Sequence, residues 1–194
     1  MSVRAGIVGA MSEPTLTATA GGTTLLAPLL AQWDTSLAMV LERLEGLSDA
    51  EYRWQPTPGA ADLVEDGSGD LRVTAEPGQA TRTIAWTLGH LADMCWARAD
   101  YTDGAKTYPL DYQPFPAGAD DAVAEVRAAA ARWRAAVAGA DAEQAVQVGY
   151  SAWPTGMDRD LPFVDIVWWM NRELIAHGSD ISTVRDLYSV RGAS

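Results

Sequence analysis

The 194-residue chain holds 26 acidic and 14 basic side chains, which gives it a net charge of −12. Proteins that bind nucleic acid or anionic membranes need clustered lysine and arginine, so this balance argues against both as partners. Hydrophobic residues make up 48% of the sequence, enough for one globular domain with a core of its own.

The first 22 residues are small and polar, with only a weak apolar stretch at residues 5–10. That stretch lacks the apolar core of a signal peptide. We therefore expect a disordered tail over residues 1–22 and a single helical domain over residues 23–194.

A first long helix is predicted over residues 25–44, because leucine, valine and tryptophan recur there at steps of three and four. Pro28 falls in its first turn, where the missing N–H does no harm. Ser48 and Glu51 have the spacing of a capping box, which predicts a short helical turn before Trp54.

Residues 60–81 are rich in glycine and acidic residues and show no helical period, so they form either a long loop or a small hairpin. Apolar periodicity then returns in three stretches, which a proline-rich connection and an irregular segment at 141–160 separate. The helices predicted there cover residues 83–101, 120–138 and 162–190.

Four long helices without a repeated strand signal predict an all-α fold, a four-helix bundle. Up-down-up-down order is the simplest topology, although connections of very different length leave room for crossovers. Such bundles build metal sites from side chains that point inward on facing helices. The predicted helices are therefore the place to look for ligands.

Two further features bear on the class of protein. No apolar run approaches the roughly 20 residues needed to cross a bilayer. Cys95 is the single cysteine, which excludes an internal disulfide and fits a reducing cytoplasm. We expect its thiol to pack as a small hydrophobic group rather than act as a nucleophile.

The chain has only two histidines, His90 and His177, and both fall inside predicted helices. Glu173 precedes His177 by four residues, so the two side chains share one helical face with β-carbons about 5–6 Å apart. Side chains at this spacing can reach one metal ion, and His90 is the only other histidine that a facing helix can supply. The same spacing also occurs in weak surface pairs, and a single buried histidine is often only a core residue.

Two imidazoles and one carboxylate form a catalytic zinc set that leaves a fourth position open for water or substrate. With a divalent ion this set has a charge of about +1, which favours hydroxide or thiolate at the open position. Zinc is the expected ion, although imidazole and carboxylate ligands also suit nickel, cobalt, manganese or iron.

Four more residues lie near the expected ligands. Trp86 and Trp169 each stand one turn before a predicted ligand, where they would either wall a dry pocket or pack in the core. Asp93 and Asp180 each stand three residues after a histidine. Either carboxylate could orient an imidazole through its second nitrogen, or simply be solvated.

Three motifs, in this order along the chain, resemble those of the DinB-like superfamily over about residues 25–190. They correspond to the stretch after its first helix, to its second helix and to its last helix. In this chain they are Tyr52-Arg53-Trp54 with Pro58-Gly59, the segment 83–91 around Leu88-Gly89-His90, and the segment 171–178 with Arg185-Asp186-Leu187-Tyr188.

The resemblance implies a four-helix bundle, often a homodimer, that binds a divalent metal through His90, Glu173 and His177. Many members have a histidine at the position of Glu173. The His-Glu-His set here is similar to that of the metal-binding domain of mycothiol-dependent maleylpyruvate isomerases, which have an additional C-terminal domain that this sequence does not match.

The function expected from the resemblance is metal-dependent S-transfer or isomerisation. The partners would be a low-molecular-weight thiol such as mycothiol and an electrophilic small molecule, and the protein would be cytoplasmic. Two alternatives remain open: a metal-dependent hydrolase, and a metal-binding interaction protein without catalytic activity.

Overall fold

The computed structural model describes residues 23–73, 81–109, 111–153 and 157–191, so the tail expected over residues 1–22 lies outside the described part. The four predicted long helices are confirmed to within a residue or two at each end. The helices are α1 (Thr23–Arg43), α2 (Asp49–Tyr52), α3 (Ile84–Asp103), α4 (Ala119–Gly139), α5 (Ala142–Val146), the 3₁₀ helix η1 (Met157–Asp160) and α6 (Phe163–Val190).

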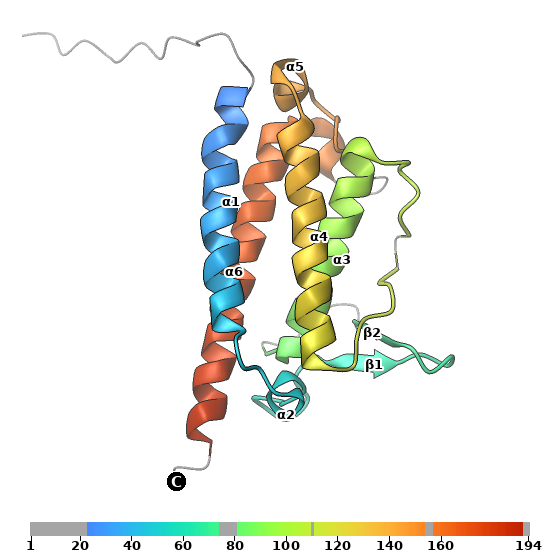
Figure 1. The fold of residues 1–194 in the computed structure, drawn as a ribbon. Helices are drawn as coiled ribbons and strands as arrows, with labels where there is room; N and C mark the ends of the chain where they lie inside the picture. The colour runs from blue at the N-terminus through green and yellow to red at the C-terminus, as the bar shows by residue number, and fades with distance from the viewer. Residues whose placement is uncertain (1–22, 74–80, 110, 154–156, 192–194) are drawn as a thin grey trace, which may run out of the picture.

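The long helices form a bundle in which α1 packs on α6 and α4, and α3 packs on α4 and α6. Figure 1 shows that α1 and α6 run in one direction, whereas α3 and α4 run in the other. The order is therefore down-up-up-down, and the simpler up-down-up-down alternative is wrong. Contacts between Trp96 and Glu125 at 2.7 Å, and between Asp103 and Arg132 at 2.5 Å, follow the parallel course of α3 and α4.

The connection between α3 and α4 makes this order possible. It contains three prolines, Pro109, Pro114 and Pro116, which prevent it from continuing as a helix. An extended chain advances about 3.3 Å per residue, against 1.5 Å per residue in a helix. The 15 residues from Gly104 to Gly118 are therefore long enough to return along the full length of α3 (Figure 1).

A small antiparallel hairpin lies beside the first half of α3. Strands β1 (Leu63–Glu65) and β2 (Leu71–Val73) pair with Leu63 opposite Val73, which confirms the hairpin alternative for this region. Both of these side chains are buried. A Cβ atom at Gly89 would lie only 2.6 Å from Cγ2 of Val73, so the glycine before His90 is what lets the hairpin pack directly on α3.

Side chains cap three of the helices. The Thr83 hydroxyl accepts the Trp86 N–H at 3.1 Å and fixes the start of α3 two turns before His90. At α2 only half of the expected capping box forms, because Ser48 accepts the Glu51 N–H but the Glu51 carboxylate pairs with Arg185 of α6 at 2.9 Å. The pair is bidentate, because two nitrogens of Arg185 donate to the two oxygens of Glu51. A capping box that the sequence analysis missed opens α5.

The core runs through the middle of the bundle. Its largest fully buried side chains are contributed by all four long helices and by α2, and they include Trp33, Tyr52, Trp86, Trp133, Phe163, Met170 and Leu174. Among the helices that the structure describes, none combines the length and the apolar character that crossing a membrane requires.

Gly178 marks a close approach of α6 to α1 directly after His177. An added Cβ atom would lie 2.6 Å from Cγ2 of the buried Val40. Overpacking costs about 1–3 kcal/mol, which exceeds the roughly 1 kcal/mol that alanine gains over glycine within a helix. We expect Gly178→Ala to lower the free energy of unfolding in urea by about 1 kcal/mol.

Gly139→Ala is the matched control, because no atom lies within 4 Å of a Cβ added at this position at the end of α4. That substitution should leave stability unchanged or raise it slightly. A Gly178→Ala protein as stable as Gly139→Ala would contradict the close packing of α1 on α6.

Candidate metal centre

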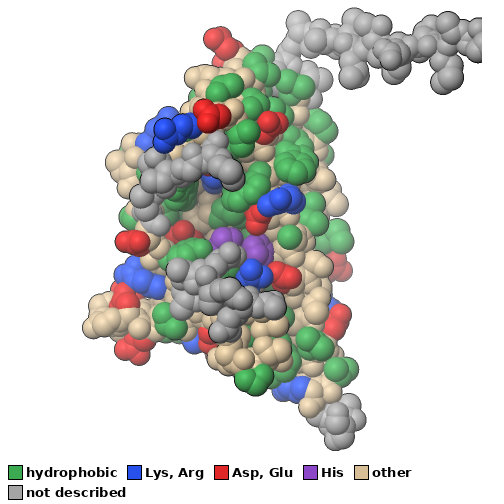
Figure 2. Space-filling view, turned by 180° about the vertical axis from the view of Figure 1, so that it is seen from behind, with side chains coloured by type: hydrophobic (Ala, Val, Ile, Leu, Met, Phe, Trp, Pro, Cys, Tyr) green, Lys and Arg blue, Asp and Glu red, His purple; other side chains and the backbone are tan. Residues whose placement is uncertain are grey.

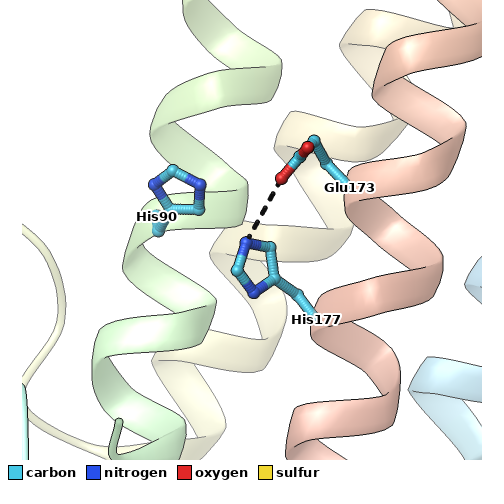
Figure 3. A group of neighbouring side chains, drawn as sticks. All are labelled: His90, Glu173 and His177. Carbon is cyan, nitrogen blue, oxygen red and sulfur yellow. Dashed lines mark ion pairs between the residues drawn. The ribbon is translucent and has the colours of Figure 1, made fainter. Parts of the chain in front are cut away.

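The two histidines and Glu173 converge between α3 and α6. His90 projects from α3, and Glu173 and His177 project from successive turns of α6 (Figure 3). One nitrogen from each imidazole and one carboxylate oxygen all lie within 4.8 Å of one another. Nε2 of His177 lies 3.6 Å from Oε2 of Glu173. The residues expected to be ligands are thus brought together as a possible metal-binding triad.

Each imidazole has a polar partner at its Nδ1 atom. The Tyr112 hydroxyl lies 3.0 Å from Nδ1 of His90, and Oδ2 of Asp180 lies 3.3 Å from Nδ1 of His177. Asp180 in turn pairs with Arg82 at 3.6 Å. Nε2 of His177 faces Glu173, and a histidine ligand usually has its other nitrogen hydrogen-bonded in this way.

The Trp86 ring packs against both imidazoles on the side that faces the core. Its fully buried ring stacks on His90 with centroids 5.0 Å apart and planes 15° apart, and it lies 6.3 Å from the ring of His177. The Arg82 guanidinium lies over the same tryptophan ring at 4.9 Å. Trp86 therefore belongs to the core and also forms one wall of the candidate site.

Burial separates this cluster from an ordinary surface pair. His177 is only 6% exposed, and His90 and Glu173 are half-buried. Figure 2 shows the two imidazoles next to each other on the face opposite that of Figure 1. Their ring centroids are 4.9 Å apart. The imidazoles can thus be reached from solvent at one edge, while the rest of each ring is enclosed by protein.

The donor set fits a transition-metal ion. Zinc binds imidazole nitrogen and carboxylate oxygen at about 2.0–2.2 Å in tetrahedral geometry, so two ligand atoms of one ion lie roughly 3.4 Å apart. The pair from His177 and Glu173 is close to this separation at 3.6 Å. The other separations within the set, which are at most 4.8 Å, need side-chain shifts of roughly 1.4 Å or less to reach it. Imidazole and carboxylate together suit zinc, nickel, cobalt or iron.

A cavity of about 350 Å³ borders the site on the side of His90. It lies between α3, α6 and the segments that follow α3 and α5, and its wall consists of His90, Asp93, Met94, Arg98, Tyr112, Trp153, Asp158 and Trp169. Its volume is at the small end of the range for ligand pockets. Trp169 lines this cavity and also packs against the core, and its expected place in a dry pocket around the metal stays a prediction.

Asp93 lines the cavity, but the structure assigns Nδ1 of His90 to Tyr112 rather than to this carboxylate. Oδ1 of Asp93 accepts hydrogen bonds from the Tyr108 hydroxyl at 2.8 Å and from the Gln113 N–H at 3.2 Å. Burial raises the pKa of Asp93, and these two bonds offset part of that effect. Sequence spacing gives no signal for Tyr112, because it lies in the irregular connection after α3.

Cys95 is buried, and burial raises the pKa of its thiol. A thiol in this environment is neither accessible nor ionised near neutral pH. The expectation that Cys95 packs as a small hydrophobic residue agrees with its place in the core.

A family model of the DinB superfamily matches residues 32–181. The chain belongs to the DinB superfamily. The matched region runs from within α1 to within α6 and includes all three residues of the possible metal-binding triad. No curated protein and no solved structure matches the chain. The all-α bundle described above agrees with this membership.

Alanine in place of any one of His90, Glu173 or His177 should reduce the metal content of the purified protein to well below one ion per chain. Two remaining ligands bind a divalent ion too weakly to survive purification. Elemental analysis measures this directly, after the protein has been loaded with zinc and then dialysed against zinc-free buffer.

Asp165→Ala is the control, because this exposed carboxylate also lies on α6 but in its first turn. It should retain the metal content of the unaltered protein. If the three alanine variants also retained it, the triad would not be the binding site.

The partners of the two Nδ1 atoms should tune affinity without being required for binding. Removal of such a partner typically costs 10–100-fold in metal affinity. We expect Tyr112→Phe and Asp180→Ala each to weaken zinc binding by roughly tenfold or more, measured by competition with a chromophoric chelator. Affinities equal to that of the Asp165→Ala control would show that these contacts do not orient the imidazoles.

Proposed function

We propose that this DinB-superfamily protein is a metal-dependent enzyme that joins a low-molecular-weight thiol, such as mycothiol, to an electrophilic small molecule, as an S-transferase or an isomerase. The observation that supports the proposal best is the convergence of His90, Glu173 and His177, of which His90 also lines a cavity. The likeness of this His-Glu-His set to that of the maleylpyruvate isomerases supports the choice of a thiol.

The origin of the nucleophile is a reason to propose an external thiol. The only cysteine of the chain is buried, and its thiol has a raised pKa, so the protein does not provide the sulfur itself. A small molecule must then bring the nucleophile into the cavity. A divalent cation at the triad would supply Lewis acidity and lower the pKa of a thiol beside it.

The residues of the chain would orient the reactants and exclude water. Tyr112 and Asp180 hold the imidazoles through their Nδ1 atoms, and the stacked Trp86 ring prevents His90 from rotating. Met94 and the two tryptophans of the cavity wall give the electrophile an apolar surface. Such positioning alone can account for a large part of a rate enhancement.

Neither reaction requires a reactant other than the thiol and the electrophile. In S-transfer the thiolate sulfur forms a bond to an electrophilic carbon while a leaving group departs with its electron pair. In isomerisation the sulfur adds to a conjugated double bond, rotation occurs about the resulting single bond, and elimination of the thiolate restores the double bond. The proton released by the thiol passes to solvent or to a nearby carboxylate in both cases.

Hydrolysis is the second candidate function, and one observation favours it. A hydrolase needs a general base near the nucleophilic water, and Asp93 has a raised pKa and lines the same cavity as His90. Water would then take the place of the thiol. Asp180 is less suited to this role, because it pairs with His177 and Arg82.

The test is a thiol-by-electrophile panel with zinc-loaded protein. Mycothiol, glutathione and N-acetylcysteine are each combined with an aryl chloride, an activated alkyl halide and a cis-configured conjugated carbonyl compound. We expect turnover that requires both the thiol and the metal and that falls at least 100-fold in Glu173→Ala and His177→Ala. A parallel titration of cobalt-loaded protein should produce a sulfur-to-cobalt absorption band with the active thiol.

Asp165→Ala again serves as the control and should keep full activity. Hydrolysis of ester or amide substrates without any thiol would favour the second candidate function. Stoichiometric metal with no turnover and no thiol-dependent band would leave a non-catalytic metal-binding protein and contradict the proposal.

A further inference from the structure

The cavity beside His90 extends along one face of α3. His90, Asp93, Met94 and Arg98 all line it, and their spacing of three, four and eight residues places them on the same face of the helix. At 1.5 Å per residue, His90 and Arg98 lie about 12 Å apart along the axis. The cavity therefore has one end at the metal centre and another end that no part of the triad reaches.

The far end is built around a buried ion pair. Arg98 is only 7% exposed, and its NH2 group lies 2.5 Å from Oδ2 of Asp158, while its NH1 group donates to the Ser151 carbonyl at 3.3 Å. The rings of Trp153 and Trp169 lie 5.3 Å and 5.1 Å from the guanidinium carbon. Arg98 is thus engaged by protein groups and is poorly placed to receive a further anion.

Asp93 lies between the two ends of the cavity, and its carboxylate can accept a further hydrogen bond. Both of its hydrogen bonds, from Tyr108 and Gln113, end on Oδ1. Within the described residues, Oδ2 accepts no hydrogen bond. Oδ2 is not among the buried polar atoms without a partner, so it remains accessible from the cavity, and an ammonium ligand could donate an N–H to it in place of water.

The charges of the cavity wall point to the same kind of ligand. In the metal-free protein two carboxylates, Asp93 and Asp158, line the cavity against the single guanidinium of Arg98, and a cation at the triad would add positive charge at the His90 end only. The excess negative charge of the wall would repel a carboxylate ligand and attract an ammonium group.

We propose that the cavity binds a small molecule with a planar or aromatic body and an ammonium group, with the ammonium donating to Oδ2 of Asp93 and the aromatic body lying between Met94 and the tryptophans. The end of the molecule nearer His90 is the end presented to the metal centre. That this ligand is the electrophilic substrate rests on the proposed function, whereas its binding to the cavity does not.

The test compares three probes that share one aromatic body: 2-phenylethylamine, 2-phenylethanol and phenylacetate. Binding is measured by calorimetry, with zinc-loaded protein and with protein treated with a chelator. We expect the amine to bind at least tenfold more tightly than phenylacetate to the metal-free protein, with the alcohol between them. This comparison uses the unaltered chain, so it does not depend on the folding of a variant.

Asp93→Asn is the accompanying variant, because an asparagine oxygen can still accept the bonds from Tyr108 and Gln113. It should weaken binding of 2-phenylethylamine at least fivefold and leave the zinc content unchanged. Asp165→Asn removes the same charge from an exposed position outside the cavity wall and should have no effect on the amine.

The outcomes separate this inference from the proposed function. Any of three results would overturn the inference. Phenylacetate could bind the metal-free protein as tightly as the amine or more tightly, no probe could bind, or the Asp93→Asn protein could bind the amine like Asp165→Asn. Amine binding that is selective and depends on Asp93 would uphold it, even if no thiol-dependent turnover were found.

Discussion

Helices α3 and α6 pack antiparallel, and the candidate site depends on the register of this contact. Two contacts between the helices follow in order, His90 with His177 at 4.9 Å between ring centroids and Arg98 with Trp169 at 5.1 Å. Arg82, two residues before α3 begins, continues the series by pairing with Asp180 at 3.6 Å. Residue numbers rise along α3 as they fall along α6. A shift of one turn, about 5.4 Å, would separate His90 from both ligands on α6.

The packing on the other sides of these two helices keeps that register. A glycine adjoins each histidine, with Gly89 facing the hairpin and Gly178 facing α1. Both allow an approach that no other residue would permit without a shift. The hydroxyl of Thr83 caps α3 and also donates to Asp62 near the hairpin at 2.9 Å, so the helix start and the hairpin are fixed together. The ligands are thus positioned by elements on both sides of the α3–α6 pair.

Much of this architecture can be predicted from the sequence, because it depends on local patterns. The apolar period locates the four long helices, and the four-residue step from Glu173 to His177 places two ligands on one face. The relative directions of the helices cannot be predicted from local patterns, because they depend on how far the connection after α3 travels. Tyr112 was missed for the same reason: its contact with His90 joins residues 22 positions apart through an irregular segment. The partner of Glu51 is Arg185, at the other end of the chain, and a local capping pattern cannot reveal it.

X-ray absorption at the zinc edge tests the central claim most directly, because it reports the ligands of the ion itself. We predict two imidazole nitrogens and at least one carboxylate oxygen at about 2.0–2.2 Å, with the multiple-scattering features of histidine rings. The Glu173→Ala and His177→Ala proteins should lose this signature. A spectrum of oxygen ligands alone, without imidazole scattering, would contradict the convergence of α3 and α6 on one cation.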